Sequence, residues 1–349
     1  MQPYIRELKI GKLNIKNNLI LAPMAGITDY PFRFIASLLG AGLTVSEMLN
    51  VTALTYKSKT TPTLAYRSSV EKPFSIQLFG NRPEHFEHSV RYIIENRMAE
   101  IIDINMGCPA RQVVGSGSGV YLMRERALAE RILKSCVSAS AQYGSDAVPI
   151  TLKIRLGWDL NSINAVDYAK MAEECGISML SVHGRTYSMR FSGTPLYEHI
   201  ASCKQAVGIP VIANGDISLY ESVKKVLDIT GADGAMIGRA AMGRIWIFYD
   251  ILSEAAGKRR LDFNIGDVIK LIKMHGRLVG TFYSDLNGVE SFRKQLLWYT
   301  KGWYNSAKLR DRLKLVNSSA EIDSMLDDYL KEIGNLKLPE NKIFNMYEK

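Results

Sequence analysis

The chain has 349 residues, a formal net charge of +9 and 47% hydrophobic residues, a composition that is ordinary for a globular protein. Its length suits one large domain followed by a smaller one. It contains no run of 18 apolar residues and no secretory apolar core near the N-terminus, so we expect no membrane span, no export and a cytoplasmic location.

The first 257 residues alternate short apolar runs with helical patterns. Eight of the runs have the length and β-branched character of buried strands, and helical periodicity follows most of them. Strands are predicted over residues 18–23, 42–47, 74–79, 101–104, 149–155, 179–183, 209–213 and 234–237. Helices are predicted over residues 31–39, 83–96, 124–143, 162–175 and 219–229. Eight βα units predict a (β/α)8 TIM barrel.

The alternative is an open, doubly wound sheet. That fold normally carries a G-x-G-x-x-G turn after its first strand, and this chain has none there. Residues 184–199 form a long segment without periodicity, which suits an irregular loop over the mouth of a barrel.

The character of the sequence changes after Gly257. Residues 258–260, Lys-Arg-Arg, are typical of a linker, and the remainder shows helical periodicity without a strand run. Helices are predicted over residues 265–282, 288–301, 307–316 and 320–333. We therefore expect two domains, a barrel over residues 1–257 and an all-α helical bundle over residues 258–349.

One cysteine stands in a position typical of chemistry. Cys108 follows the predicted strand 101–104 and precedes a Gly-rich loop at 115–119, and parallel α/β folds place their active sites at such strand ends. A thiol with a pKa of about 8.5 is mostly protonated at neutral pH, so it can donate a proton, or attack if its pKa is lowered. The four cysteines are widely spaced, without a C-x-x-C pair or a His cluster, which argues against a zinc site and a disulfide framework.

Three polar residues interrupt otherwise apolar strands. Gln77, Lys153 and His183 could each be a satisfied core residue, but strand ends of a barrel converge at one mouth. Together they suggest a flat heteroaromatic ligand that is recognised by hydrogen bonds.

Glycines follow the last two predicted strands. In barrels the loops after strands seven and eight commonly bind a phosphate through backbone N–H groups, and Gly215 and Gly238 would let the backbone approach it, with Arg239 as an ionic partner. A phosphate site together with a heteroaromatic site suggests flavin mononucleotide (FMN), whose anionic reduced ring Lys153 would stabilise.

The bundle contains a basic segment, residues 293–314, with a single acid, Asp311. Its cations are Arg293, Lys294, Lys301, Lys308, Arg310, Arg312 and Lys314, and its aromatics are Trp298, Tyr299, Trp303 and Tyr304. Cations bind phosphates and aromatic rings stack on bases, so the charge excess favours an RNA partner. The aromatics are better explained as the core of the bundle than as an RNA surface.

Seven segments carry a resemblance to a known family. They are LAPMAGITDYPFR (21–33), GAGLTVSEM (40–48), IIDINMGCPA (101–110), TLKIRLGW (151–158), VHGRT (182–186), IPVIANGDI (209–217) and TGADGAMIGRAAMGR (230–244). In these segments the chain resembles the tRNA-dihydrouridine synthases, most closely the bacterial B-type branch. The resemblance spans about residues 10–250, and the C-terminal part resembles the helical domain of the family more loosely.

The resemblance implies an enzyme that reduces the C5–C6 bond of specific uridines in tRNA to 5,6-dihydrouridine with FMN and NADPH. Flavin N5 would give hydride to C6, and Cys108 would protonate C5. The implied FMN-binding residues are Pro23, Met24, Ala25, Gln77, Lys153, His183, Asn214, Gly215, Asp216, Gly238 and Arg239. Asn105, Arg155 and Arg185 would face the uridine, and Arg293 and Lys294 would contact RNA. No metal and no obligate protein partner is expected.

Two other functions compete with this interpretation. An FMN barrel that reduces a small pyrimidine or an enone would share the flavin site but has no need of a basic bundle. An RNA-binding protein whose barrel has lost its activity would need neither the flavin nor the thiol.

Overall fold

The computed structural model describes residues 3–56, 61–260 and 262–338. The Cα positions divide the chain into two compact units, residues 1–238 and residues 239–349. The predicted boundary lies at 257/258, whereas this division falls after residue 238. Residues 239–257 therefore group with the helices of the second unit and not with the barrel. Residues 339–349 of the predicted second domain lie outside the described part.

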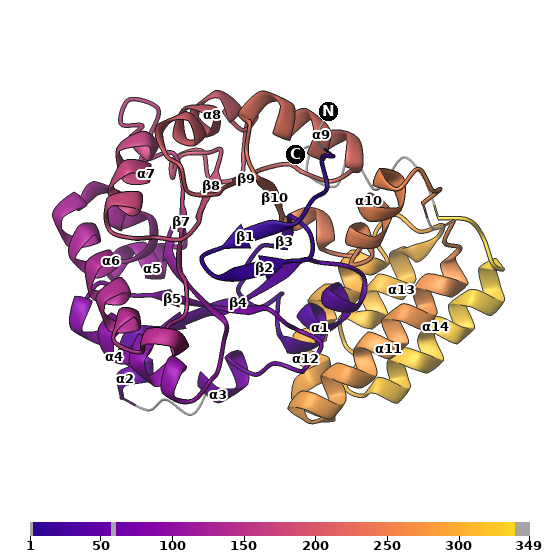
Figure 1. Ribbon diagram of the computed structural model, residues 1–349. Helices are drawn as coiled ribbons and strands as arrows, with labels where there is room; N and C mark the ends of the chain where they lie inside the picture. The colour runs from indigo at the N-terminus through magenta and orange to yellow at the C-terminus, as the bar shows by residue number, and fades with distance from the viewer. Residues whose placement is uncertain (1–2, 57–60, 261, 339–349) are drawn as a thin grey trace. The chain divides into compact units, whose positions relative to one another are not determined.

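The first unit is built around a closed barrel of eight parallel strands (Figure 1). The strands are β3 (Leu19–Leu21), β4 (Leu43–Asn50), β5 (Phe74–Phe79), β6 (Ile101–Met106), β7 (Ile150–Ile154), β8 (Leu180–His183), β9 (Val211–Asn214) and β10 (Gly234–Ile237). They follow chain order around the ring, and β10 pairs with β3 to close it. The predicted TIM barrel is confirmed, and each predicted strand overlaps an observed one.

A hairpin that the sequence analysis does not predict lies across the ring of strands in Figure 1. It consists of β1 (Leu8–Ile10) and β2 (Leu13–Ile15), which pair antiparallel. Leu8 and Ile15 belong to the same buried cluster as Leu43 and Ile101, the first residues of β4 and β6. The hairpin therefore covers the amino-terminal end of the barrel, and the loops at the carboxyl-terminal end carry the candidate site.

Helices surround the barrel. They are α1 (Tyr30–Leu38), α2 (Val51–Thr55), α3 (Thr61–Leu64), α4 (Pro83–Glu95), α5 (Arg111–Gly115), α6 (Arg126–Ala141), α7 (Ala165–Glu174), α8 (Tyr197–Ala206) and α9 (Tyr220–Thr230), with 3₁₀ turns η1 (Gly119–Arg124) and η2 (Gly144–Asp146). The sequence analysis missed α2, α3, α5 and α8. Three of these are too short to show a period, and α8 buries only Ile200 and Cys203, which leaves a weak apolar pattern.

The second unit is helical throughout its described part. It contains η3 (Arg239–Ala241), α10 (Ile247–Ala255), α11 (Ile265–Tyr283), α12 (Asp285–Tyr299), α13 (Ser306–Leu313) and α14 (Ser319–Ile333). Helix α11 packs against α12 and α14, and α13 packs against the same two helices. The last four helices match the predicted bundle, whereas α10 was not predicted.

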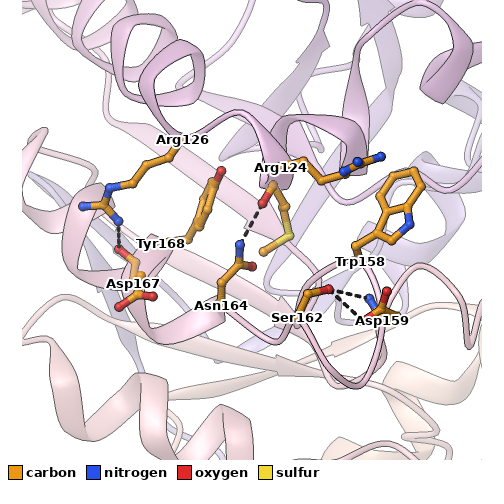
Figure 2. Close-up of a pocket in the computed structure, with 9 residues that line it drawn as sticks. Arg124, Arg126, Trp158, Asp159, Ser162, Asn164, Asp167 and Tyr168 are labelled. Carbon is orange, nitrogen blue, oxygen red and sulfur yellow. Dashed lines mark hydrogen bonds between the residues drawn. The ribbon is translucent and has the colours of Figure 1, made fainter.

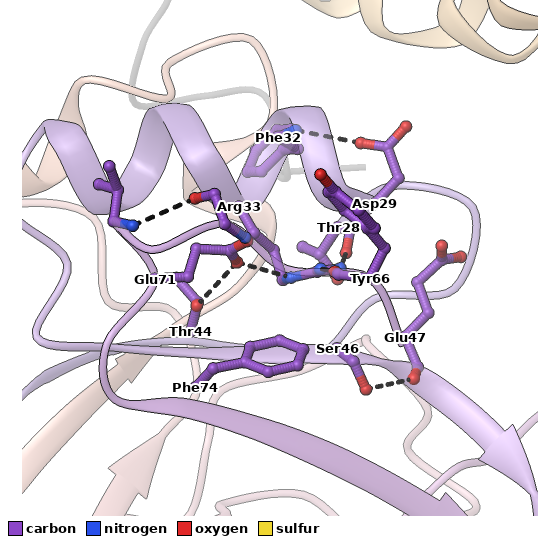
Figure 3. Close-up of polar contacts among 12 residues, drawn as sticks. Thr28, Asp29, Phe32, Arg33, Thr44, Ser46, Glu47, Tyr66, Glu71 and Phe74 are labelled. Atoms are coloured by element: carbon purple, nitrogen blue, oxygen red, sulfur yellow. Dashed lines mark hydrogen bonds and ion pairs between the residues drawn. The ribbon is translucent and has the colours of Figure 1, made fainter. Parts of the chain in front are cut away.

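A buried ion pair ties α1 to the segment before β5 (Figure 3). Arg33 Nε lies 2.9 Å from Glu71 Oε1, and both side chains are fully buried. Arg33 also donates to the backbone carbonyls of Thr28 and Tyr66, and its guanidinium lies 4.8 Å from the centre of the Phe74 ring. Loss of either charged partner would leave the other charge buried and uncompensated.

Candidate active site

A chain of hydrogen bonds links the neighbouring strands β7, β6 and β5 to the Cys108 loop. Thr151 Oγ1 donates to Asp103 Oδ1 over 2.6 Å, and Gln77 Nε2 donates to Asp103 Oδ2 over 2.7 Å. Asn105 Nδ2 donates to Gln77 Oε1 over 2.8 Å, and Asn105 Oδ1 accepts the backbone N–H of Cys108 over 2.9 Å. Parallel pairing of β5, β6 and β7 brings these residues together.

The two ends of this chain determine the orientation of the amides between them. An ionised carboxylate only accepts hydrogen bonds and a backbone N–H only donates them. Gln77 must therefore turn its NH₂ group to Asp103 and its carbonyl oxygen to Asn105, and Asn105 must turn its carbonyl oxygen to Cys108. The carboxylate of Asp103 thus helps to hold the Cys108 loop in place.

We expect Asp103→Leu to lower the free energy of unfolding by at least about 2 kcal/mol, because it leaves two buried donors, on Gln77 and Thr151, without an acceptor. Asp103→Asn retains an acceptor for Gln77, and its NH₂ group can donate to the Thr151 hydroxyl. Its free energy of unfolding should therefore fall by less than that of Asp103→Leu. Urea denaturation measures the free energy of unfolding of both variants. An equal decrease in the two would contradict the proposed directions of these hydrogen bonds.

Cys108 is half-buried and follows the carboxyl end of β6, the position that the sequence analysis predicts for it. Its role as a proton donor stays a prediction. Burial raises the pKa of this thiol, while the backbone N–H of Ala110 and the charges of Arg155 and Lys153 oppose the shift. The surroundings therefore keep the thiol protonated at neutral pH and place cations where they stabilise the thiolate that remains after proton donation.

Lys153 and Asn214 meet at the same end of the barrel. Lys153 Nζ donates to Asn214 Oδ1 over 3.2 Å, and Asn214 Nδ2 donates to the backbone carbonyl of Met236 over 2.8 Å. Burial lowers the pKa of Lys153 to about 8, Arg155 adds to the shift, and Asp103 and Cys108 oppose it. Lys153 is therefore an ammonium whose charge is sensitive to pH in the alkaline range.

The predicted phosphate-binding glycines lie at the ends of neighbouring strands, Gly215 after β9 and Gly238 after β10. Within the described part of the chain, the backbone N–H groups of Gly215 and Gly238 donate to no acceptor. Asp216 is ion-paired, and Arg239 begins the second unit. The two N–H groups are suited to an anion, as the sequence analysis expects.

Two predicted substrate-facing arginines are almost fully buried. Arg155 donates to the backbone carbonyls of Gly107, Thr186 and Arg190. Arg185 donates to both carboxylate oxygens of Asp216 over 3.0 and 2.6 Å and to the carbonyls of residues 192 and 193. These bonds hold the loop that follows β8, and contact of either arginine with uridine stays a prediction.

The remaining predicted cofactor residues line the same barrel end. Pro23, Met24 and Ala25 follow β3, and a Cβ placed on Gly238 would lie 3.7 Å from Met24 Sδ. His183 ends β8, where it pairs in register with Asn214, and its ring is buried. The structure thus brings the residues of the first unit that are predicted to bind the cofactor to one end of the barrel.

The sequence analysis did not single out three polar residues of this region. Asp103 and Thr151 belong to the hydrogen-bond chain, and Glu47 on β4 accepts the backbone N–H of Gly26. Burial raises the pKa of both carboxyl groups. In the sequence, Asp103 and Glu47 could have been noticed because each places a carboxyl group within a predicted, otherwise apolar strand.

The basic segment 293–314 contributes both core and surface. Tyr299 and Trp303 are buried in the bundle, where Trp303 stacks on Tyr329 with ring centres 5.8 Å apart, whereas Tyr304 is 62% exposed. Most of the cations are exposed: Lys294, Lys301, Lys308, Arg312 and Lys314.

Arg293 has a structural explanation of its own. It donates to the carbonyl of Val316 and to Asn317 Oδ1, each over 2.9 Å, and so holds the turn before α14. Contact of Arg293 and Lys294 with RNA stays a prediction.

Two further features are absent from the residues that the structure describes. None of their helices is both long and apolar enough to cross a membrane. No group of three or more of their His, Cys, Asp and Glu side chains is arranged to hold a metal ion.

Comparison with known proteins adds to this geometry. The family model for dihydrouridine synthase matches residues 20–334. The chain belongs to the dihydrouridine synthase family. It is 37% identical to tRNA-dihydrouridine synthase B of Vibrio parahaemolyticus over 94% of this chain and 100% of that protein. It is 41% identical to tRNA-dihydrouridine synthase B of Pseudomonas putida over 84% of this chain and 85% of that protein. The resemblance to the B-type branch is confirmed, and membership of the dihydrouridine synthase family makes the chain an oxidoreductase.

Solved structures share the barrel with this dihydrouridine synthase. A variant of NCR from Zymomonas mobilis matches with a TM-score of 0.52 and 16% identity over 73% of this chain and 92% of that one. Histamine dehydrogenase from Rhizobium sp. 4-9 matches with a TM-score of 0.52 and 14% identity over 93% and 63%. At these identities the likeness shows the fold alone.

Proposed function

We propose that this protein reduces specific uridines in tRNA to 5,6-dihydrouridine, with FMN as cofactor, NADPH as reductant and Cys108 as proton donor to C5. The named relatives above point to tRNA, and the net charge of +9 favours a polyanionic substrate. The observation that carries the proposal is the half-buried Cys108 thiol, which lies beside polar side chains at the carboxyl end of the barrel and whose pKa is raised by burial.

The residues present fit a flavin mononucleotide. The N–H groups of Gly215 and Gly238, which find no acceptor among the described residues, suit its phosphate, and the absence of a side chain on Gly238 leaves room near Met24. Lys153 provides a cation for a ring that becomes anionic on reduction. The site would be completed by Pro23, Ala25, Gln77, His183, Asn214, Asp216 and Arg239. When bound, the flavin supplies the hydride that adds to C6 of the uracil ring.

The chain's own residues would handle the proton. Asn105 holds the backbone at Cys108, so the thiol has a defined position. The Cys108 S–H bond breaks as a C–H bond forms at C5 of uracil, and the thiolate then recovers a proton from water. Arg155 and Lys153 stabilise that thiolate. The uridine must leave the stacked RNA to reach the site, at an expense of a few kcal/mol.

The test uses purified full-length protein. We expect visible flavin absorption, and we expect incubation with an unmodified tRNA transcript and NADPH to yield a nucleoside two hydrogen atoms heavier than uridine by mass spectrometry. Binding of tRNA should weaken steeply as salt is added.

Two outcomes would overturn the proposal. Reduction of a free pyrimidine or enone without modification of tRNA would support the small-molecule alternative. A colourless protein that still binds tRNA would support an inactive RNA-binding barrel.

The pKa of Lys153, about 8, leads to a pH prediction. As pH rises through that value Lys153 loses its proton, and the stabilisation of an anionic reduced ring is lost with it. We expect the rate of dihydrouridine formation to fall above pH 8, and Lys153→Arg to move the decline to higher pH because a guanidinium stays charged. The rate is measured for both proteins across the alkaline range, and identical profiles would contradict the role of Lys153.

A further inference from the structure

The ring of Trp158, in the loop after β7, is covered by groups from two other segments of the chain. Tyr187, in the loop after β8, lies against it with ring centres 4.2 Å apart and planes 32° apart. The guanidinium of Arg124, the last residue of η1, lies 4.7 Å from the centre of the same ring. We call these three side chains the Trp158 stack. The proposed reaction assigns no role to any of them.

Turn η1 is attached to the loop that carries the reactive thiol. Val120 N–H donates to the carbonyl of Cys108 over 3.2 Å. Gly119 has φ +62°, and a Cβ there would lie 2.8 Å from the same carbonyl oxygen, so η1 approaches the Cys108 backbone closely only because residue 119 is glycine. A shift of η1 would therefore shift Cys108.

The loops after β7 and β8 form a firm support for the ring of Trp158. Tyr187 N–H donates to the carbonyl of Gly157, and Ser188 N–H donates to the carbonyl of Trp158, each over 2.9 Å. Gly157 has φ +147°, and a Cβ there would lie 2.4 Å from the carbonyl oxygen of residue 162. The backbone on both sides of the ring is thus fixed by hydrogen bonds and by a turn that requires glycine.

Two hydrogen bonds hold the end of η1 from the segment that leads into α7. Asn164 Nδ2 donates to the carbonyl of Met123 over 2.7 Å, and Tyr168 Oη donates to the carbonyl of Leu122 over 2.6 Å. Both bonds act on the backbone of η1, so they leave its last side chain to other contacts.

A pocket of about 480 Å³ adjoins this end of η1 (Figure 2). Arg124 lies with Trp158 at one end of the pocket, and Arg126 lies with Asp167 at the other. Because open space adjoins η1 here, loss of the Trp158 ring would enlarge a space that already exists. The contact of Arg124 with Trp158 is therefore an important link between η1 and the loop after β7.

We infer that Trp158 is a positioning residue for Cys108. Through Arg124 and η1, its ring holds the loop that carries the thiol against the loops after β7 and β8, without contact between Trp158 and the substrate. The inference rests on the proposed function for the role of Cys108 as proton donor, whereas the contacts that position the thiol do not depend on that role.

The test measures how fast iodoacetamide alkylates Cys108 in the full-length protein. The variants are Trp158→Ala, Trp158→Phe and Arg124→Ala. The matched controls are Tyr92→Ala and Arg131→Ala, which remove a ring from α4 and a charge from α6 at exposed positions outside the stack. Mass spectrometry of the peptide that contains Cys108 gives the rate across the neutral and alkaline range, at equal flavin content.

The remaining measurements separate positioning from other effects. Alkylation of Cys136 and Cys203, both buried, reports general loosening of the fold. The kcat and the KM for a tRNA transcript are measured from dihydrouridine formation.

We expect Trp158→Ala to raise the rate of Cys108 alkylation by about 5- to 70-fold, because a cation–π contact and a ring–ring contact no longer oppose local opening. Arg124→Ala should raise it by about 2- to 5-fold, and Trp158→Phe, which retains a ring, should stay near the unchanged protein. The alkylation profile of Trp158→Ala should move to lower pH, because burial raises the pKa of the Cys108 thiol and opening relieves it. Both control variants should behave as the unchanged protein.

A positioning role also predicts a division between the kinetic constants. In Trp158→Ala the kcat should fall, because the thiol is less often in place, while the KM for tRNA stays the same. Trp158→Phe should restore the kcat.

Three results would overturn the inference. The first is an unchanged rate of Cys108 alkylation in a folded Trp158→Ala protein. The second is an equal rise at Cys136 and Cys203, which would show general loosening. The third is a higher KM for tRNA with unchanged alkylation, which would assign Trp158 to RNA binding instead.

Failure of the inference can be distinguished from failure of the proposed function, because alkylation is measured without turnover. Faster alkylation of Cys108 in Trp158→Ala, together with no dihydrouridine formation by the unchanged protein, would keep the positioning role and reject the proposed function.

Discussion

Replacement of Cys108 by alanine should lower the rate of dihydrouridine formation by about 10²- to 10⁴-fold, which is the usual contribution of a positioned general acid. The thiol is half-buried, and burial raises its pKa, so it is protonated when the substrate binds. Flavin content and the Kd for tRNA should stay near those of the unchanged protein, because the backbone of residue 108 still donates to Asn105. Single-turnover measurement of dihydrouridine by mass spectrometry tests the rate.

The chain offers a matched control for this experiment. Cys175 is buried at the end of α7, and the hydrogen-bond chain that the structure describes from Thr151 to Cys108 does not include it. Cys175→Ala should leave the rate unchanged, so a loss confined to Cys108→Ala identifies the proton donor. Near-normal turnover by Cys108→Ala would reject the role of the thiol and, with it, the mechanism proposed above.

Replacement of Glu71 by glutamine should lower the free energy of unfolding by about 3–5 kcal/mol, because it leaves the Arg33 guanidinium buried without its counter-charge (Figure 3). Both side chains are fully buried, so solvent cannot screen the unpaired charge. The change in urea denaturation midpoint, with the slope unchanged, measures the loss.

Two comparisons sharpen this prediction. Glu87 pairs with Arg91 over 2.8 Å on the surface of α4, and Glu87→Gln should cost less than about 1 kcal/mol because water solvates the remaining charge. The double variant Arg33→Met, Glu71→Leu should recover much of the loss, because no charge is then left buried. A Glu71→Gln variant as stable as Glu87→Gln would show that Arg33 finds other compensation.

The positions of Gln77, Lys153 and Asn214 could be predicted from the sequence, because the carboxyl ends of parallel strands meet at one end of a barrel whatever the loops do. Their hydrogen-bond partners could not be predicted in this way. The bond from Gln77 to Asp103, across two strands, depends on the register between β5 and β6, which no local pattern specifies. The FMN, NADPH and RNA assignments remain proposals.

The arginines near strand ends also have positions that the sequence predicts and partners that it does not. The family resemblance implies that Arg155 and Arg185 face the uridine. In the structure their guanidiniums donate to carbonyls of the loop after β8 and to Asp216. A guanidinium can donate to the oxygens of a ligand or to the carbonyls of a loop. Which acceptors lie within reach depends on the path of segments that are distant in the sequence.

The sequence by itself determined the eight strands, five of the helices around them, the helical bundle and the placement of Cys108 at a strand end, because apolar period and strand length are local properties. Only the tertiary structure decided which polar groups meet. It produced the Asp103–Gln77–Asn105 hydrogen bonds and the Arg33–Glu71 pair, which join residues far apart in the chain. Such contacts depend on how strands align and loops fold back, and neither is encoded in any single stretch of residues.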